Sequence, residues 1–185
     1  MNKQSISTLV IAGLLIIVAA LSRVFMYPDN FSPIIGMAIF AGAVITNKRL
    51  AFAFPLLAMF LSDILFEVFN IAPGFWGWGQ LVGYGILALI TVIAFSMKRI
   101  SVLSVAGYSI GASLLFFLLS NSAFFVFDNP IYNLYPQNFS GYITSLAAGI
   151  PFLRTGIVAD LVYSGVLFGT YFLVKHYAFS KKALA

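Results

Sequence analysis

Long apolar segments separated by short polar stretches make up most of the chain. A membrane-spanning helix needs about 20 consecutive apolar residues. Six segments approach or meet this requirement: Thr8–Phe25, Pro33–Thr46, Leu50–Phe69, Gln80–Met97, Val102–Phe127 and Gly156–Val174. The second is short enough to be re-entrant, so five spans are the alternative. The pattern predicts an all-α, polytopic membrane protein, a six-transmembrane-helix bundle, with residues 1–185 forming a single transmembrane domain.

The loop Asp128–Leu153 contains an apolar stretch of its own, Tyr142–Phe152, which is bracketed by Gly141 and Pro151. Glycine and proline commonly mark the ends of helices. The pattern therefore predicts a separate short interfacial helix in the last external loop.

Composition supports the membrane class. Hydrophobic residues make up 62% of the chain, charged residues only 8%, and the mean hydropathy is +1.03. Soluble domains average about 25% charged residues. The net charge of +5 therefore does not indicate a nucleic-acid partner, because in a membrane protein Lys and Arg mostly mark the cytoplasmic side.

The basic residues favour one orientation in the cell membrane, with both termini cytoplasmic. Six spans then leave only Arg23 and Arg154 outside. The other basic residues lie inside: Lys3, Lys48, Arg49, Lys98, Arg99, Lys175, Lys181 and Lys182. In the five-span alternative, Lys3 lies outside and Arg23 inside, and the number of basic residues on each side is unchanged. The positive-inside rule therefore does not separate the two arrangements.

The acidic residues show the opposite bias. All five carboxylates, Asp29, Asp63, Glu67, Asp128 and Asp160, fall in the outer half of the six-span arrangement. Ionisable groups at membrane depth are costly and usually face a cavity or a partner. The sequence therefore predicts that polar groups converge on the extracytoplasmic side.

A polar hexapeptide occurs twice, as YPDNFS at 27–32 and YPQNFS at 135–140. An internal duplication would extend past the motif, and the flanking residues do not match. Asn30 and Asn138 also fit the glycosylation pattern N-x-[ST]. We favour a third interpretation, in which Asn and Ser side chains cap helix starts and Pro33 occupies the first helical position.

Several outer polar residues are candidates for binding a solute, each with a structural alternative. Asp63 and Glu67, at i and i+4, share a helix face, and they could instead pair with Arg23 or Arg154. Asp160, six residues after Arg154, could contact a ligand or tether a helix. Asn121 could bind a ligand or bridge two helices.

The tryptophans Trp76 and Trp78 lie in a glycine-rich loop, where they could cover a ligand or anchor the chain at the membrane interface. Small residues at four-residue spacing, Ala38 with Gly42 and Gly107 with Gly111, predict close helix packing or a partner interface.

Motifs of catalysis are missing from the sequence. The single histidine, His176, follows the last span on the side away from the acids, and the chain has no cysteine. HExxH, P-loop and dinucleotide-binding motifs do not occur. We expect no catalytic residues, no metal site and no cofactor.

An ordered set of segments resembles a known family: RVFMYPDNFSPIIGMAIFAGA (23–43), PLLAMFLSD (55–63), NSAFFVF (121–127), YPQNFSG (135–141), PFLRT (151–155) and DLVYSGVLFG (160–169). The set resembles the substrate-binding S components of energy-coupling-factor (ECF) transporters. More narrowly, it is similar to a group of short bacterial S-component-like proteins of unassigned substrate.

The resemblance implies a six-helix subunit of the bacterial inner membrane that captures a vitamin or similar micronutrient. It also implies docking on a membrane T component driven by two ATPases. The candidate substrate-binding residues are Arg23, Asn30, Asp63, Glu67, Trp76, Trp78, Asn121, Arg154 and Asp160. The chain lacks the cysteine of a cobalamin-handling relative, which excludes cobalt–thiolate chemistry. The alternatives are an ion-coupled transporter or channel with Asp63 and Glu67 as its cation site, and a non-transporting scaffold.

Overall fold

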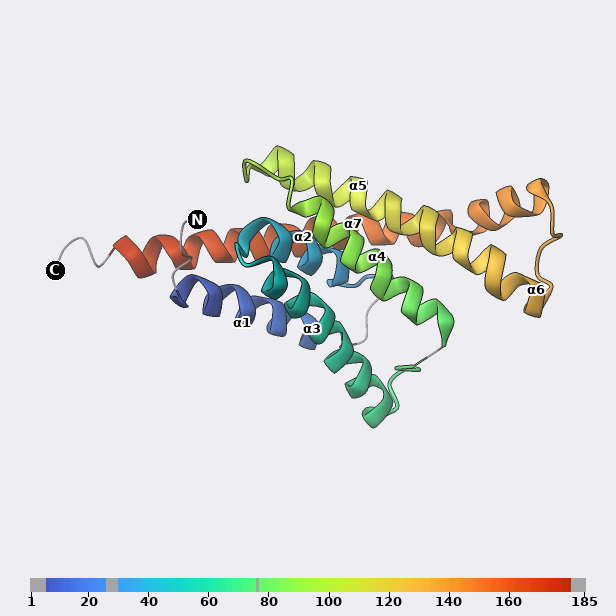
Figure 1. The fold of residues 1–185 in the computed structure, drawn as a ribbon, viewed down its shortest axis with the longest axis horizontal. Coiled ribbons are helices and arrows are strands. Elements are labelled where there is room, and N and C mark those ends of the chain that lie inside the picture. The colour runs from blue at the N-terminus through green and yellow to red at the C-terminus, as the bar shows by residue number, and fades with distance from the viewer. Residues whose placement is uncertain (1–5, 26–29, 76, 181–185) are drawn as a thin grey trace.

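The computed structural model describes residues 6–25, 30–75 and 77–180, and side chains are described up to residue 177. These residues form helices and connecting loops, without a strand in the described ranges (Figure 1). In chain order the elements are α1 (Ile6–Ser22), α2 (Ile34–Val44), α3 (Lys48–Phe69), α4 (Trp78–Ala94), α5 (Val102–Ala123), a π-helical turn (Phe124–Asp128), α6 (Asn129–Tyr132) and α7 (Phe139–Ser180).

The helices of the described residues confirm the predicted all-α class, and their apolar composition is consistent with a membrane protein. Three helical stretches of the described chain are long and apolar enough to cross a bilayer: Lys48–Phe69, Val102–Tyr132 and Phe139–Tyr177. The helices α1, α2 and α4 are apolar but shorter. Large apolar side chains such as Leu57, Leu118 and Val166 face outward, which suits a surface in contact with lipid.

Helix α2 is the centre of the bundle. It contacts α1, α3, α4, α5 and α7, and all its residues except Ile34 and Ala43 are buried. The Phe40 ring packs edge-on against Phe168 and Tyr171 of α7, with centroids 5.2 and 5.6 Å apart. With 11 residues, α2 is about 16 Å long and covers only part of the bundle's length.

Glycines bring α2 close to two of its neighbours. A Cβ at Gly42 would lie 2.6 Å from both the Ala94 Cβ and the Thr91 carbonyl oxygen of α4. A Cβ at Gly36 would lie 3.2 Å from the Tyr163 Cβ of α7. Ala38 is completely buried. In the described chain, Ala38 and Gly42 therefore serve internal packing.

The predicted separate helix at Tyr142–Phe152 is wrong, because this segment is the first part of the 42-residue α7. Gly141 does not break the helix: it leaves room for Pro136, whose carbonyl carbon would lie 2.8 Å from a Cβ at this position. Pro151 lies inside α7, and membrane helices tolerate prolines in their interior.

We predict that Gly42→Ala destabilises the protein by about 1–3 kcal/mol, the usual cost of overpacking, because the added methyl group meets the α4 backbone. Gly169→Ala is the matched control, since a Cβ there meets nothing within 4 Å. Thermal unfolding in detergent measures both. Equal unfolding temperatures for the two variants would refute the close α2–α4 contact.

Candidate functional site

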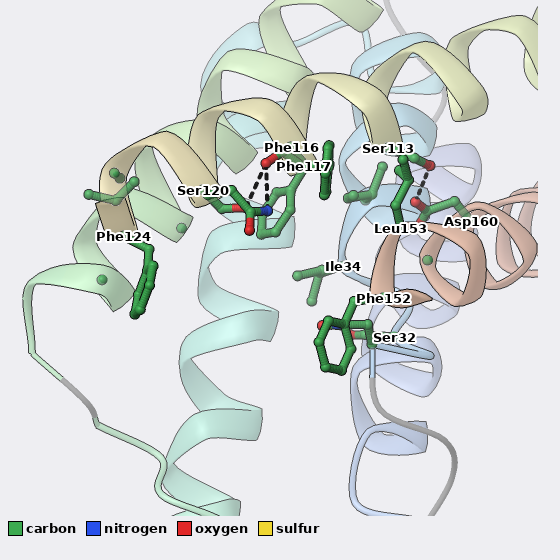
Figure 2. Close-up of a pocket in the computed structure, with 18 of the residues that line it drawn as sticks. Ser32, Ile34, Ser113, Phe116, Phe117, Ser120, Phe124, Phe152, Leu153 and Asp160 are labelled. Carbon is green, nitrogen blue, oxygen red and sulfur yellow. Dashed lines mark hydrogen bonds between the residues drawn. The ribbon is translucent and has the colours of Figure 1, made fainter. Parts of the chain in front are cut away.

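A cavity of about 510 Å³ opens beside the N-terminal end of α2. Its walls are residues of α3, α4, α5 with the π-helical turn, and α7, together with Arg23 and the segment 30–35 (Figure 2). Pockets of about 300–1,000 Å³ are typical of small-molecule sites. The volume of the cavity is therefore typical of a small-molecule site.

Phenylalanine rings form much of the cavity wall. They come from four parts of the chain: Phe31, Phe66, Phe116, Phe117, Phe124 and Phe152. Along α5 and the start of the π-helical turn they are interspersed with polar residues. The residues that line the cavity there are Ser113, Phe116, Phe117, Ser120, Asn121 and Phe124. Figure 2 shows this stretch along the cavity, with Ser113 near one end and Phe124 near the other.

Arg23, which follows the end of α1, reaches α3. Its Nη1 donates a hydrogen bond to Asp63 Oδ1 at 2.8 Å and to the Met59 carbonyl at 3.4 Å. It also donates to the Ser62 hydroxyl. The guanidinium lies over the Phe66 ring, 4.9 Å from its centroid. Arg23 is thus held by a carboxylate on one side and an aromatic face on the other.

Asp63 is the junction of three helices. Its side chain is 4% exposed, and its Oδ2 accepts hydrogen bonds from Gln80 Nε2 at 3.0 Å and the Tyr84 hydroxyl at 2.7 Å, both on α4. With Arg23, the carboxylate accepts bonds from three residues. The structural alternative for Asp63, an ion pair with Arg23, is therefore the observed one.

Glu67 does not join Asp63 in a cation site. Its side chain is exposed, and Oε2 accepts a hydrogen bond from the Gly74 backbone N–H at 3.0 Å. Gln80 donates to the Gly74 carbonyl at 2.8 Å. Together these two side chains fasten the α3–α4 loop.

Asp160 of α7 lines the opposite part of the cavity and is 2% exposed. Its Oδ2 accepts a hydrogen bond from the Ser113 hydroxyl of α5 at 2.6 Å (Figure 2). One turn further, Ser109 donates to Ser164 at 2.9 Å. These bonds join α5 to α7, and among the described residues Asp160 has no basic partner.

Asn121 also lines the cavity, and its side chain lies close to α7. Its Nδ2 donates to the Phe117 carbonyl at 2.8 Å. A Cβ at Gly149 would lie 2.8 Å from Asn121 Oδ1. The neighbouring Ser122 shares a hydrogen bond of 2.8 Å with the Tyr142 hydroxyl, so this end of α5 both lines the cavity and packs on α7.

The two hexapeptides behave differently. Asn138 caps α7 as predicted, with Oδ1 accepting from the Gly141 N–H at 3.0 Å. At the first copy, the expected cap is wrong: Pro33 precedes α2 without a side-chain cap, and the buried Ser32 hydroxyl has no hydrogen-bond partner. Asn30 adopts φ = 61°. Asn30 and Ser32 line the cavity instead.

Two other predicted residues, Trp78 and Arg154, lie outside the cavity wall. Trp78 is 76% exposed at the start of α4, and Arg154 is exposed on α7. Trp76 falls outside the described residues. Gly107 and Gly111 border a second, apolar groove of about 530 Å³ between α4 and α5.

Sequence reasoning missed most of the cavity wall. It missed the phenylalanines, Ser113, and the glycines Gly83 and Gly156, where a Cβ would meet nothing within 4 Å. One signal was available on α5, where serine, asparagine and phenylalanine recur with the period of a helix face. The glycines carry no comparable signal, because the sequence does not show which glycines face a void.

The chain matches a family described as "Family of unknown function (DUF6580)" over residues 2–183. It belongs to this family. Searches among curated proteins and among solved structures gave no match. The function of this DUF6580 member must therefore be argued from the geometry of its cavity.

We predict that Arg23→Met destabilises the protein by about 3–5 kcal/mol, because it leaves a buried carboxylate without its cation. Glu67→Gln is the control, since its exposed side chain keeps an acceptor for the Gly74 N–H. The readouts are the yield of monodisperse protein and its unfolding temperature.

The double variant Arg23→Met/Asp63→Asn tests the cause. Asparagine removes the buried charge and keeps an oxygen that accepts from Gln80 and Tyr84, so we expect it to recover part of the lost stability. A double variant less stable than Arg23→Met would show that the uncompensated charge is not the origin of the loss.

Proposed function

We propose that the protein is a membrane-embedded substrate-capture subunit for uptake of a vitamin or similar micronutrient, as its resemblance to ECF transporter S components implies. The cavity carries this proposal. It combines a suitable volume, an aromatic wall and polar groups from Arg23, Asp63, Asn121 and Asp160. Apolar pockets with a few converging polar groups are the usual form of small-molecule sites.

The proposal includes six spans with both termini in the cytoplasm of a bacterial cell. Successive helices of the bundle run in alternating directions between its two ends (Figure 1). The α2–α3 and α4–α5 connections, with Lys48, Arg49, Lys98 and Arg99, lie at the end opposite the cavity. By the positive-inside rule, that end faces the cytoplasm and the cavity opens outward.

The contacts of the charged residues favour capture over the two alternatives. An ion-coupled transporter with Asp63 and Glu67 as its cation site is disfavoured, because Asp63 is saturated by Arg23, Gln80 and Tyr84 and Glu67 holds a loop. A scaffold would use its ionisable groups to pair with one another. Asp160 instead faces a void without a basic partner in the described chain.

Energy for uptake would come from other subunits, because the sequence has no P-loop motif. The proposed partner is a membrane T component with its ATPases. Gly107 and Gly111 border the apolar groove near the proposed cytoplasmic end. Their role in a partner interface stays a prediction.

Labelling of single cysteines tests the orientation, since the natural chain has none. We expect Gln137→Cys, exposed in the α6–α7 loop at the cavity end, to react with a membrane-impermeant maleimide on intact cells. Lys98→Cys, at the opposite end, should react only after the membrane is opened. The reverse pattern would refute an outward-facing cavity.

We further predict that protein purified in mild detergent retains a small molecule that mass spectrometry detects after denaturation. Gly156→Leu should reduce its amount at least about tenfold, the effect of roughly 1.4 kcal/mol, because the new side chain enters the cavity. Gly169→Leu, on an exposed part of the same helix, should retain it.

Two results would count against capture. One is that the wild-type protein yields no small molecule and gains no thermal stability from any vitamin in a panel. The other is that Gly156→Leu retains the molecule as well as Gly169→Leu, which would place its binding outside the cavity.

A further inference from the structure

The charges that line the cavity do not balance. Among the described residues of its wall, the charged side chains are Arg23, Asp63, Asp128 and Asp160. Arg23 and Asp63 neutralise each other at 2.8 Å. Asp128 and Asp160 have no basic partner within the described chain, so the cavity presents two uncompensated carboxyl groups.

Asp160 is the more informative of the two, because it is 2% exposed. Its Oδ2 accepts the Ser113 hydrogen bond, which is the one hydrogen bond to the Asp160 side chain found in the described part of the chain. A buried carboxylate that lacks a counter-charge is energetically costly. A cation bound in the cavity would supply the charge that the protein itself does not provide there.

The walls around this carboxyl group suit an organic cation. Phenyl rings attract cations over their faces, and Phe116, Phe117 and Phe152 line the same cavity (Figure 2). The protein already uses this interaction, with the Arg23 guanidinium 4.9 Å from the Phe66 centroid. A metal ion would need several oxygen ligands, and the described residues contain no cluster of three His, Cys, Asp or Glu that could hold one.

Asp128 lies at the other end of the cavity. Positions 113 and 128 are separated by about 22 Å along α5 and the π-helical turn, so Asp160, beside Ser113, is far from Asp128. Asp128 is only half-buried. A half-buried carboxylate raises the local concentration of cations around the cavity, whereas Asp160 would meet them inside it.

We infer that the ligand is a small organic cation, a protonated or quaternary nitrogen on a flat ring, with its charge at Asp160 and its ring among the phenylalanines. Asn121, which also lines the cavity, is placed to hydrogen-bond the ring's polar edge. This inference rests on the proposed capture function, whose ligand class it names.

Three probes with the same ring test the inference: the 1-methylnicotinamide cation, neutral nicotinamide and the nicotinate anion. Isothermal titration of purified wild-type protein should give the cation at least about tenfold tighter binding than nicotinamide, equivalent to roughly 1.4 kcal/mol, and nicotinate the weakest. Asp160→Asn should abolish this preference, because its amide oxygen still accepts from Ser113 without carrying charge. Glu67→Gln, outside the cavity, should preserve it.

The charge of the molecule that co-purifies with the wild-type protein is the second readout, and it needs no variant. A cationic molecule supports the inference even where the probes bind weakly. An anionic or neutral molecule, probes that bind without charge preference, or a preference that survives in Asp160→Asn would overturn the cation inference and leave capture standing. A wild-type protein that binds no probe and carries no molecule would overturn both.

Discussion

The hydrogen bonds and ion pair of the buried Asp63 carboxylate are the interactions on which the cavity half of the bundle depends. The carboxylate receives hydrogen bonds from Arg23 after α1 and from Gln80 and Tyr84 on α4, and so fixes three helices relative to one another. Apolar side chains cannot do this in lipid, because the acyl chains compete for the same contacts. The ion pair and the hydrogen bonds of Asp63 depend on direction as well as distance, so they fix how these helices are oriented and hold one wall of the cavity in place.

The cavity exists because α2 is short. Helix α2 fills the centre of the bundle over 11 residues, and glycines let α4 and α7 close around it. Beyond its N-terminal end, the longer helices α3, α5 and α7 continue without a central helix between them, and the cavity lies there. The tight packing of one half and the void of the other are thus consequences of one difference in helix length. They need no separate explanation.

The sequence predicted the helical segments and the gathering of polar residues well, because hydrophobic runs and rare charges are strong signals in a membrane protein. Of the residues that it named as substrate-binding, Arg23, Asn30, Asp63, Asn121 and Asp160 line the cavity; their binding role stays a prediction. The sequence did not predict that Gly141 and Pro151 lie within α7, because their usual helix-ending role is overridden by the close approach of Pro136 and by the surroundings of a membrane helix. The sequence also did not show that Asp63 and Glu67 have different roles. The difference arises because Asp63 accepts hydrogen bonds from α4, whereas Glu67 accepts one from the loop at Gly74.

The failed cap at Ser32 and the unpaired Asp160 both depart from local rules. Those rules predict a capped helix and a paired carboxylate, and natural proteins tend to depart from them where they function. Both residues line one cavity, although the Ser32 hydroxyl itself is enclosed by protein. The Asp160 carboxyl group is the one that a ligand in the cavity can contact, so a ligand bound there should stabilise the fold through this site. A scaffold without a ligand would gain no such stability, and this difference supports the proposed binding function.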